Sequence, residues 1–259
     1  VRSAQFRRKL VLQSLRRQLD RGQRVLDLVG EPPRHFRPCR IALGLRKVGD
    51  VIEDYHVAGH RGDGKARAAQ QQHARYARTL ATLGCRLVEL ATEPGLPDSV
   101  FVEDTAIVLD EIAVLARPGA VSRQPEVVSV AAALEGWRTC VRIESPGTLD
   151  GGDVLRVGRD LYVGESGRSN AAGIAQLASA IAPFGYRAMG VPLRGCLHLK
   201  SAVTCVGPDT LLINDAWVDR AYWPGMRFIA VAPEEPHAAN SLMVGETLIH
   251  AASAPRTRE

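Results

Sequence analysis

The chemistry of this 259-residue chain centres on the stretch Thr148–Leu155, in which Asp150 and Asp153 bracket a Gly-Gly pair. Glycines in such a place let the backbone turn sharply or come close to a ligand. Asp150 is then expected on a rigid edge of the fold. The alternative is a surface hairpin turn with polar tips, which residues of these types also form.

An acidic group lies upstream, at Asp98, Glu103 and Asp104. Glu103 and Asp104 are predicted to interrupt an apolar strand, in which neighbouring side chains point to opposite faces. One of the two carboxylates then faces inward and needs a partner, because burying an unpaired charge is costly. That partner is either a cationic side chain of the fold or a cationic ligand. Asp98 shares the parity of Asp104, so both can reach the same site.

His198 lies in a hydrophobic, strand-like run further downstream. Such a histidine is more often structural than catalytic, although near pH 7 an imidazole can both donate and accept protons. Arg123 and Arg168 each precede a predicted helix, where a guanidinium can hold a carboxylate in a two-point contact or simply be solvated. A metal site that includes Cys196 is not favoured, because the spacing matches no known ligand pattern.

The composition is that of an ordinary globular protein, with 46% hydrophobic and 24% charged residues. No apolar run approaches the roughly 18 residues of a membrane helix, and five cysteines without a CxxC pair favour a reducing, cytoplasmic setting. Residues 1–47 hold 13 Lys/Arg and 3 Asp/Glu. Without aromatic interleaving or a nucleic-acid-binding motif, we interpret residues 1–60 as a basic extension of uncertain structure. We expect neither a nucleic-acid nor a membrane partner.

The elements that must position these residues recur in the order hairpin, helix, strand. Hairpins are predicted to begin near residues 100, 154, 199 and 241, which are 54, 45 and 42 residues apart. Helices are predicted at 65–83, 125–134 and 170–182, and strands at 86–90, 138–143, 186–191 and 226–231. Repeats of this period suggest a ring or propeller, and a generic α/β sandwich is the alternative.

Taken together, several of these segments resemble the dimethylarginine dimethylaminohydrolase family, within the guanidino-group-modifying, or amidinotransferase, superfamily. The matching stretches are PDSVFVEDTAIV (97–108), RPGAVSRQPEV (117–127), GTLDGGDVLRVGRDLYVG (147–164), RSN (168–170), LHLKSAVT (197–204) and ASAPRT (252–257). The resemblance runs from about Lys65 to Thr257 and is specific, since independent motifs occur in order.

The resemblance implies a five-bladed α/β propeller of ββαβ repeats, with residues 61–259 as the catalytic domain and the active site on the central axis. It implies hydrolysis of N-methylated arginine to citrulline and a methylamine, without a metal or an organic cofactor. It also implies roles for seven residues: His198 as general acid and base, Asp150 as the acid that holds the guanidinium and orients the site, Asp98, Glu103 and Asp104 as substrate-binding acids, and Arg123 and Arg168 at the amino-acid end.

The chain departs from the family pattern in its nucleophile. The guanidinium carbon is a poor electrophile, so a cysteine thiolate is expected to attack it, and the family places that cysteine in a Thr-Cys-x-Ser motif near its C-terminus. None of the five cysteines lies in such a motif: Cys39, Cys85, Cys140, Cys196 and Cys205. The opening strand is not identified in residues 1–60 either. We therefore expect a propeller incomplete at both ends and a chain with little or no activity.

Two other functions stay open at this point. One is a related reaction on another guanidino compound, such as arginine deimination or amidino transfer. The other is a protein that binds cationic amino acids without turnover. A homodimer is open as well, because the sequence does not determine the oligomeric state.

Overall fold

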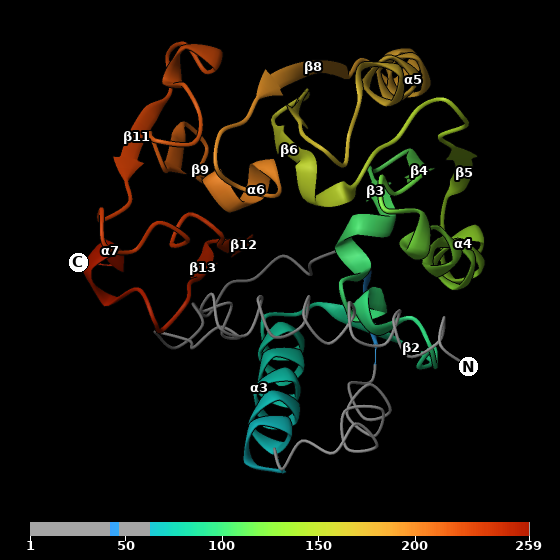
Figure 1. Ribbon diagram of the computed structural model, residues 1–259, viewed down its shortest axis with the longest axis horizontal. Helices are drawn as coiled ribbons and strands as arrows, with labels where there is room; N and C mark the ends of the chain where they lie inside the picture. Colours follow the sequence, from blue (N-terminus) through green and yellow to red (C-terminus); the bar gives the residue numbers. More distant parts are fainter. Residues whose placement is uncertain (1–41, 47–62, 259) are drawn as a thin grey trace, which may run out of the picture.

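The computed structural model describes residues 42–46 and 63–258. In this part of the chain, five small sheets follow one another around a ring (Figure 1). The helices α4 (Val127–Glu135) and α5 (Ala171–Ile181) lie on the outside of the ring, whereas the short α6 (Leu199–Ala202) lies towards the middle. The five-bladed α/β propeller expected from the sequence is confirmed.

Three of the sheets share one plan, in which an antiparallel hairpin is followed by a third strand parallel to its second strand. Their strands are β3 (Ala106–Val108), β4 (Ile112–Leu115) and β5 (Thr139–Arg142); β6 (Val154–Val157), β7 (Asp160–Glu165) and β8 (Arg187–Pro192); and β9 (Val203–Gly207), β10 (Thr210–Ile213) and β11 (Arg227–Ala230). The parallel third strand requires a crossover, which α4 and α5 supply in the first two of these sheets.

The other two sheets contain two strands each. In one, β1 (Ala42–Arg46) runs parallel to β2 (Arg86–Leu90), and α3 (Asp63–Thr82) precedes β2. In the other, β12 (Leu242–Val244) pairs with β13 (Thr247–Ile249), ahead of α7 (Pro255–Arg258). The strand β1 was missed by the sequence analysis and lies within the segment assigned to the N-terminal extension. The rest of that extension lies outside the described residues.

Two predicted strands begin as turns of helix. The stretch predicted as one strand from Val100 to Leu109 begins at the last residue of a 3-10 turn, η1 (Pro97–Val100), and contains a second one, η2 (Val102–Thr105), ahead of β3. Phe101 separates the turns with φ −88° and ψ 63°, which is not an extended conformation. The strand predicted from Leu199 begins only at Val203, because α6 precedes it. The acidic residues Glu103 and Asp104 therefore lie in a turn rather than in a strand.

Neighbouring sheets share hydrophobic clusters. The strand β7 shows how this works: Leu161 and Val163 face a cluster shared with β4 and α5, whereas Tyr162 faces a cluster shared with β9 and β10. Alternate side chains thus serve two cores, as the two-residue period of a strand requires. A third cluster joins the first and last sheets, since Leu80 and Cys85 pack with Val244 and Ile249. Within the described residues, no helix is long and apolar enough to cross a membrane.

The start of α5 packs directly on the segment that leads to Asp150. Asn170 caps the helix by accepting a hydrogen bond from the Gly173 N–H, and its side chain also accepts one from the Thr148 N–H. A Cβ placed on Gly173 would lie 2.1 Å from the carbonyl oxygen of Thr148. A glycine is required there because the helix touches the backbone of the neighbouring segment.

We predict that Gly173→Ala lowers the free energy of unfolding by about 1–3 kcal/mol, because the added methyl group must separate two backbones in a packed region. Gly136→Ala is the matched control, since a Cβ there meets no atom within 4 Å; a change within about 0.5 kcal/mol is expected. Urea unfolding followed by circular dichroism measures both. Equal losses for the two variants would contradict the close contact.

Candidate active site

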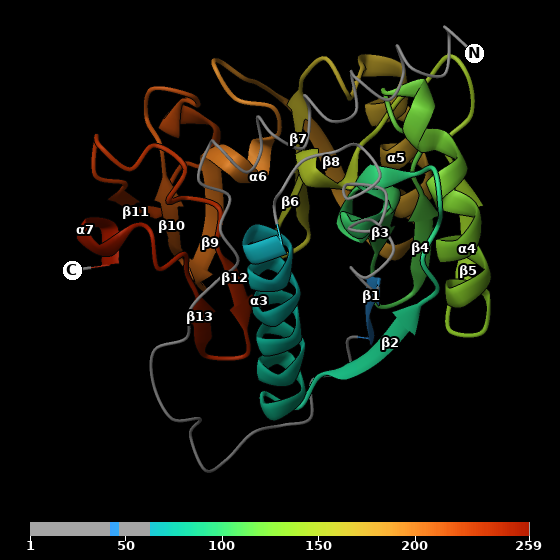
Figure 2. The same cartoon turned by 60° about the horizontal axis from the view of Figure 1, so that its bottom comes forward.

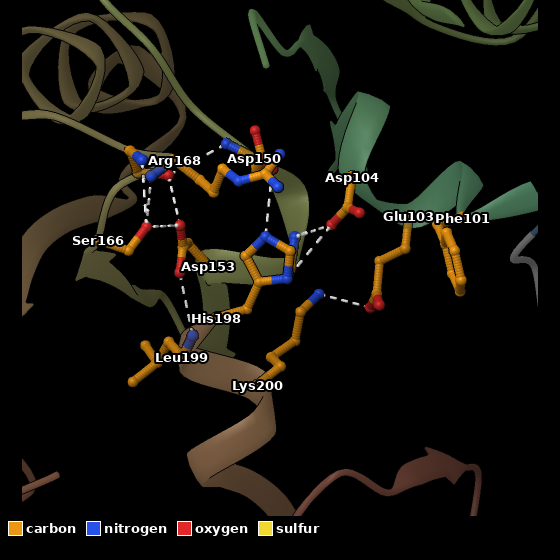
Figure 3. A network of polar contacts seen from close by, with 12 residues as sticks. Phe101, Glu103, Asp104, Asp150, Asp153, Ser166, Arg168, His198, Leu199 and Lys200 are labelled. Atoms are coloured by element: carbon orange, nitrogen blue, oxygen red, sulfur yellow. Dashed lines mark hydrogen bonds and ion pairs between the residues drawn. The ribbon is translucent and has the colours of Figure 1, made fainter. Parts of the chain in front are cut away.

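Three side chains meet near the centre of the ring, each from the segment that leads into a different sheet. Asp104 lies in η2 ahead of β3, Asp150 precedes η4 (Gly151–Asp153) ahead of β6, and His198 precedes α6 ahead of β9. One carboxylate oxygen or ring nitrogen of each lies within 4.8 Å of the others. Figure 3 shows the imidazole between the two carboxylates. The structure thus brings together three residues that the sequence analysis selected separately.

Asp150 is the most firmly held of the three. Its side chain is completely buried, and its Oδ2 lies 3.2 Å from Nε2 of His198. Its Oδ1 accepts a hydrogen bond from the Gly119 N–H at 3.0 Å, while its own N–H donates to the hydroxyl of Ser169. The carboxylate is therefore fixed by the backbone of one neighbouring loop and aimed at the imidazole.

The Gly-Gly pair allows the backbone to pass between these side chains. A Cβ on Gly152 would lie 2.6 Å from Oδ1 of Asp104 and 2.7 Å from Nδ1 of His198. The Gly152 N–H donates to the same oxygen of Asp104 at 2.9 Å. On Gly151, a Cβ would collide with the carbonyl oxygen of Glu103. Both glycines are needed for close approach, which leaves the hairpin-tip interpretation without support.

The surroundings favour a protonated His198. Burial by itself would lower the pKa of this imidazole, but the hydrogen bond to Asp150 and the charges of Asp104 and Asp153 outweigh it and raise the pKa above its ordinary value. Burial likewise would raise the pKa of Asp104, yet the charges of His198 and Arg123 lower it. The imidazolium beside these carboxylates therefore persists to higher pH than that of an ordinary histidine.

Asp153 is a supporting residue that the sequence analysis assigned no role, although it belongs to the same Gly-Gly motif. Its buried carboxylate accepts hydrogen bonds from the hydroxyls of Ser166 and Ser169, and from the Leu199 N–H at 3.0 Å. Leu199 directly follows His198, so Asp153 holds the backbone from which the imidazole projects. Burial raises the pKa of Asp153, against the charge of His198 and these hydrogen bonds.

Arg123 has protein partners in the structure. Its guanidinium is buried and pairs with Asp104 and with Glu126, a residue that the sequence analysis did not select. It also donates to the carbonyl oxygens of Asp98 and Phe101, at 3.1 and 3.3 Å. Arg123 thus holds the acidic turns in place. It is the cationic partner that the buried carboxylate of Asp104 needs. Its contact with the amino-acid end of a substrate stays a prediction.

Arg168 and Asp98 each present a buried polar atom without a hydrogen bond from the described residues. These atoms are Nη1 of Arg168 and Oδ1 of Asp98. Nη1 of Arg168 lies 3.8 Å from Oδ2 of Asp150, which places Arg168 beside the Asp150–His198 pair. Glu103 lies at the rim, with 65% of its side chain exposed, and pairs with Lys200. The seven selected residues thus come from five segments of the chain: the acidic turns at 98–104, the segments that carry Arg123 and Arg168, and the segments that carry Asp150 and His198.

The cluster of His198, Asp104 and Asp150 contains donor types that also bind divalent cations. Both oxygens of Asp104 already accept hydrogen bonds, from the Gly152 N–H and from Arg123. Asp150 uses one oxygen for Gly119 and the other for His198. The geometry is that of a hydrogen-bonded acid–base network, which fits a metal poorly.

Comparisons with known proteins agree with this fold and site. No family model matches the chain. It is 42% identical over 193 residues to the N(G),N(G)-dimethylarginine dimethylaminohydrolase of Streptomyces coelicolor, covering 74% of each protein. It is 34% identical over 210 residues to the enzyme of the same name from Pseudomonas aeruginosa, covering 80% of this chain and 83% of the relative.

A solved structure gives the same result. The Pseudomonas aeruginosa dimethylarginine dimethylaminohydrolase, as a cysteine-to-serine variant in complex with citrulline, matches 74% of this chain and 76% of its own with a TM-score of 0.72 and 34% identity. The fold and the relatives define a hydrolase that acts on carbon–nitrogen bonds of linear amidines, and a solved amidinotransferase has a similar fold. The chain belongs to the dimethylarginine dimethylaminohydrolase family.

We predict that Arg123→Met destabilises the protein by about 3–5 kcal/mol, because it leaves the buried carboxylates of Asp104 and Glu126 without their cation. Arg187→Met is the matched control: Arg187 pairs with Asp160 at the surface, where an ion pair contributes about 1 kcal/mol or less. Urea unfolding at pH 7 compares the two. A loss below about 1 kcal/mol for Arg123→Met would show that the buried network does not depend on it.

The raised pKa of His198 gives a second prediction. Protonated His198 stabilises the fold fully below its unfolded pKa of about 6.5, and this contribution is lost as pH rises through the higher folded pKa. Asp150→Asn removes the hydrogen-bonded charge and is expected to lower the pKa of His198. Titration of the ring protons by NMR measures the change, with His250 as the control, since its pKa is lowered by burial. A titration of His198 that is unchanged in the variant would contradict the pairing.

Proposed function

We propose that the protein hydrolyses N-methylated arginine to citrulline and a methylamine, with His198 as general acid and base and a cysteine thiolate as nucleophile. The observation that carries the proposal is the buried Asp150–His198 pair among carboxylates, in a member of this family. A relative with 34% identity has been solved with citrulline bound, which is the product expected here.

The charges around His198 suit a substrate with a cationic side chain and a carboxylate. Glu103 is the exposed acid of the site, and Asp98 has a free carboxylate oxygen among the described residues. Carboxylates of this kind hold a planar guanidinium in fixed orientation. Nη1 of Arg168 makes no hydrogen bond within the described residues, although it lies 3.8 Å from Asp150, so Arg168 can direct an N–H group to the carboxylate of the substrate. Asp104 and Asp150 then act mainly through His198, because their oxygens already have partners.

The reaction follows from the position of the imidazole. The thiolate adds to the guanidinium carbon, and protonated His198 gives its proton to the methylated nitrogen, which leaves as the amine. The carbon is then bound to sulfur and still carries one nitrogen besides the side-chain nitrogen. A water molecule then adds to that carbon through its oxygen, and neutral His198 takes one of the protons of the water. The adduct then expels the thiolate and loses its hydroxyl proton to solvent, which leaves the neutral ureido group of citrulline and a protonated His198 ready for the next turnover.

The described cysteines fit the role of the nucleophile poorly. Cys196 lies closest in sequence to His198, but its thiol contacts the carbonyl oxygen of His198. Burial, together with the charge of Asp153, raises the pKa of this thiol to about 11. At neutral pH it is almost entirely protonated and therefore weakly nucleophilic. We propose that Cys196 is not the nucleophile, and the low activity expected for these 259 residues stays a prediction. A reactive thiolate also suits the reducing cytoplasm proposed from the sequence.

The proposal is tested by binding and turnover on the same sample. Calorimetry of the folded chain is expected to show saturable binding of asymmetric dimethylarginine. Binding should weaken at least about tenfold in Glu103→Gln, which removes a charge that faces the guanidinium. A citrulline assay with dimethylarginine, run beside arginine, measures turnover, and Cys196→Ser tests the assignment of that thiol.

Absence of dimethylarginine binding by a folded chain would contradict the proposed function. Equal turnover of unmethylated arginine would instead support a deiminase. Citrulline formation that is lost in Cys196→Ser would overturn the exclusion of Cys196 but support the hydrolase. Binding without product would support a chain that needs a nucleophile from outside these residues.

A further inference from the structure

Lysine is rare in this protein, and one lysine lies at the site. The chain contains only Lys9, Lys47, Lys65 and Lys200, so every other basic residue after Lys65, apart from the histidines, is an arginine. Lys200 follows His198 by two residues, in the short helix α6. The reaction proposed above assigns it no role.

The ammonium group of Lys200 contacts an acid that is proposed to bind substrate. Its Nζ lies 2.5 Å from Oε1 of Glu103, which is 97 residues away in the sequence and belongs to η2 (Figure 3). Among the described residues, this is the ion pair that Glu103 makes. The pair therefore connects the two segments that carry His198 and Asp104, at the rim of the site.

Glu103 differs from the other acids in how its charge is held. Asp104 and Asp150 are buried, and their oxygens are bound by backbone N–H groups, Arg123 and His198. Glu103 is 65% exposed in its side chain, whereas 24% of the Lys200 side chain is exposed. Within the described part of the chain, the charge of Glu103 is thus balanced by one flexible lysine side chain.

We propose that Lys200 is an exchangeable counter-ion of Glu103, which a guanidinium displaces on binding and which returns when the bound side chain becomes neutral. The inference rests on the proposed function. Methylated arginine carries a positive charge, and the ureido group of citrulline carries none. The pair therefore opens when the substrate binds and re-forms once the bound side chain is neutral.

The chemistry of lysine suits exchange better than that of arginine. An arginine would hold the carboxylate of Glu103 with two parallel hydrogen bonds in a fixed plane, which a substrate guanidinium could replace only by breaking both. The ammonium is a point charge on a flexible stem, and a partly exposed ion pair of this kind is weak enough to be exchanged. In a chain that otherwise relies on arginine, this position holds the cation that is easier to release.

The test compares Lys200→Met, Lys200→Arg and the wild-type full chain by calorimetry with dimethylarginine and with citrulline. Lys200→Met is expected to bind dimethylarginine about three- to tenfold more tightly, because no internal cation competes for Glu103. Its affinity for citrulline should change less than about twofold. Lys200→Arg should bind dimethylarginine more weakly than the wild type. In a Glu103→Gln background, Lys200→Met should lose its effect on affinity.

The controls separate this inference from the proposed function. Arg187→Met removes a surface cation that pairs with Asp160 and should leave both affinities unchanged. If the wild type binds dimethylarginine but Lys200→Met does not bind it more tightly, the counter-ion inference is wrong and the proposed function stands. If the folded wild type binds no dimethylarginine, both are overturned.

A second measurement follows Lys200 itself. Acetylation of the wild-type chain by an amine-selective reagent, analysed by mass spectrometry with Lys65 as the internal reference, reports how free the ammonium group is. Saturating dimethylarginine, or the Glu103→Gln substitution without ligand, is expected to increase the relative rate at Lys200. Citrulline should not increase it. A rate that is the same in all four samples would show that Glu103 does not hold Lys200, and would overturn the inference.

Discussion

The site depends on how the protein compensates the buried charges of Asp150 and Asp153. An isolated carboxylate inside a protein costs several kcal/mol, and it persists there only with hydrogen-bonded or charged partners. Both aspartates are completely buried, and the partners of their carboxylates come from other segments: Gly119, Ser166, Ser169, His198 and Leu199. Each partner contributes a hydrogen bond and also fixes a loop relative to the Gly-Gly segment. The compensation of two charges therefore assembles the site.

The arrangement of the sheets explains why these segments meet. In three successive blades, the segment that enters the first strand runs near the centre of the ring (Figure 1), and these segments carry Asp104, Asp150 and His198. Gly151 and Gly152 allow the middle segment to approach its two neighbours closely. The geometry of the site and the packing of the blades thus both require glycine at these two positions. The cluster between α3, β2 and the last hairpin completes the ring on its other side. Figure 2 shows α3 beside the last hairpin, β12–β13.

Most of the regular structure could be predicted from the sequence, because helices such as α5 and hairpins such as β6–β7 have clear periodicity and turn residues. The strand β1 was missed, since five residues with a central glycine carry little signal before their partner β2 is known. The turns around Phe101 were predicted as a strand because Val100, Phe101 and Val102 form an apolar run of strand-forming residue types. Side-chain hydrogen bonds from Arg123 and Thr105 to the backbone instead accompany a 3-10 conformation. In both cases, contacts that are distant in sequence decide the local structure.

The candidate site, too, could be predicted only in part from the sequence. Residue types and motif order selected Asp104, Asp150 and His198, and the structure places them together. The sequence could not show that Arg123 is engaged by Asp104 and Glu126, or that Asp153 supports His198 through Leu199, because these roles depend on side-chain geometry. It equally could not separate Glu103, at the exposed rim, from its buried neighbour Asp104. Which acid meets a ligand is a property of burial, and burial follows from the fold.

A crystal structure of the chain with dimethylarginine bound tests the central claim most directly. The account predicts that the guanidinium lies beside His198 and contacts Glu103 and Asp98, with the carboxylate of the ligand directed towards Arg168. The Asp150–His198 pair should be retained in the complex. A ligand bound elsewhere on the ring, or one whose guanidinium lies out of reach of His198, would contradict it.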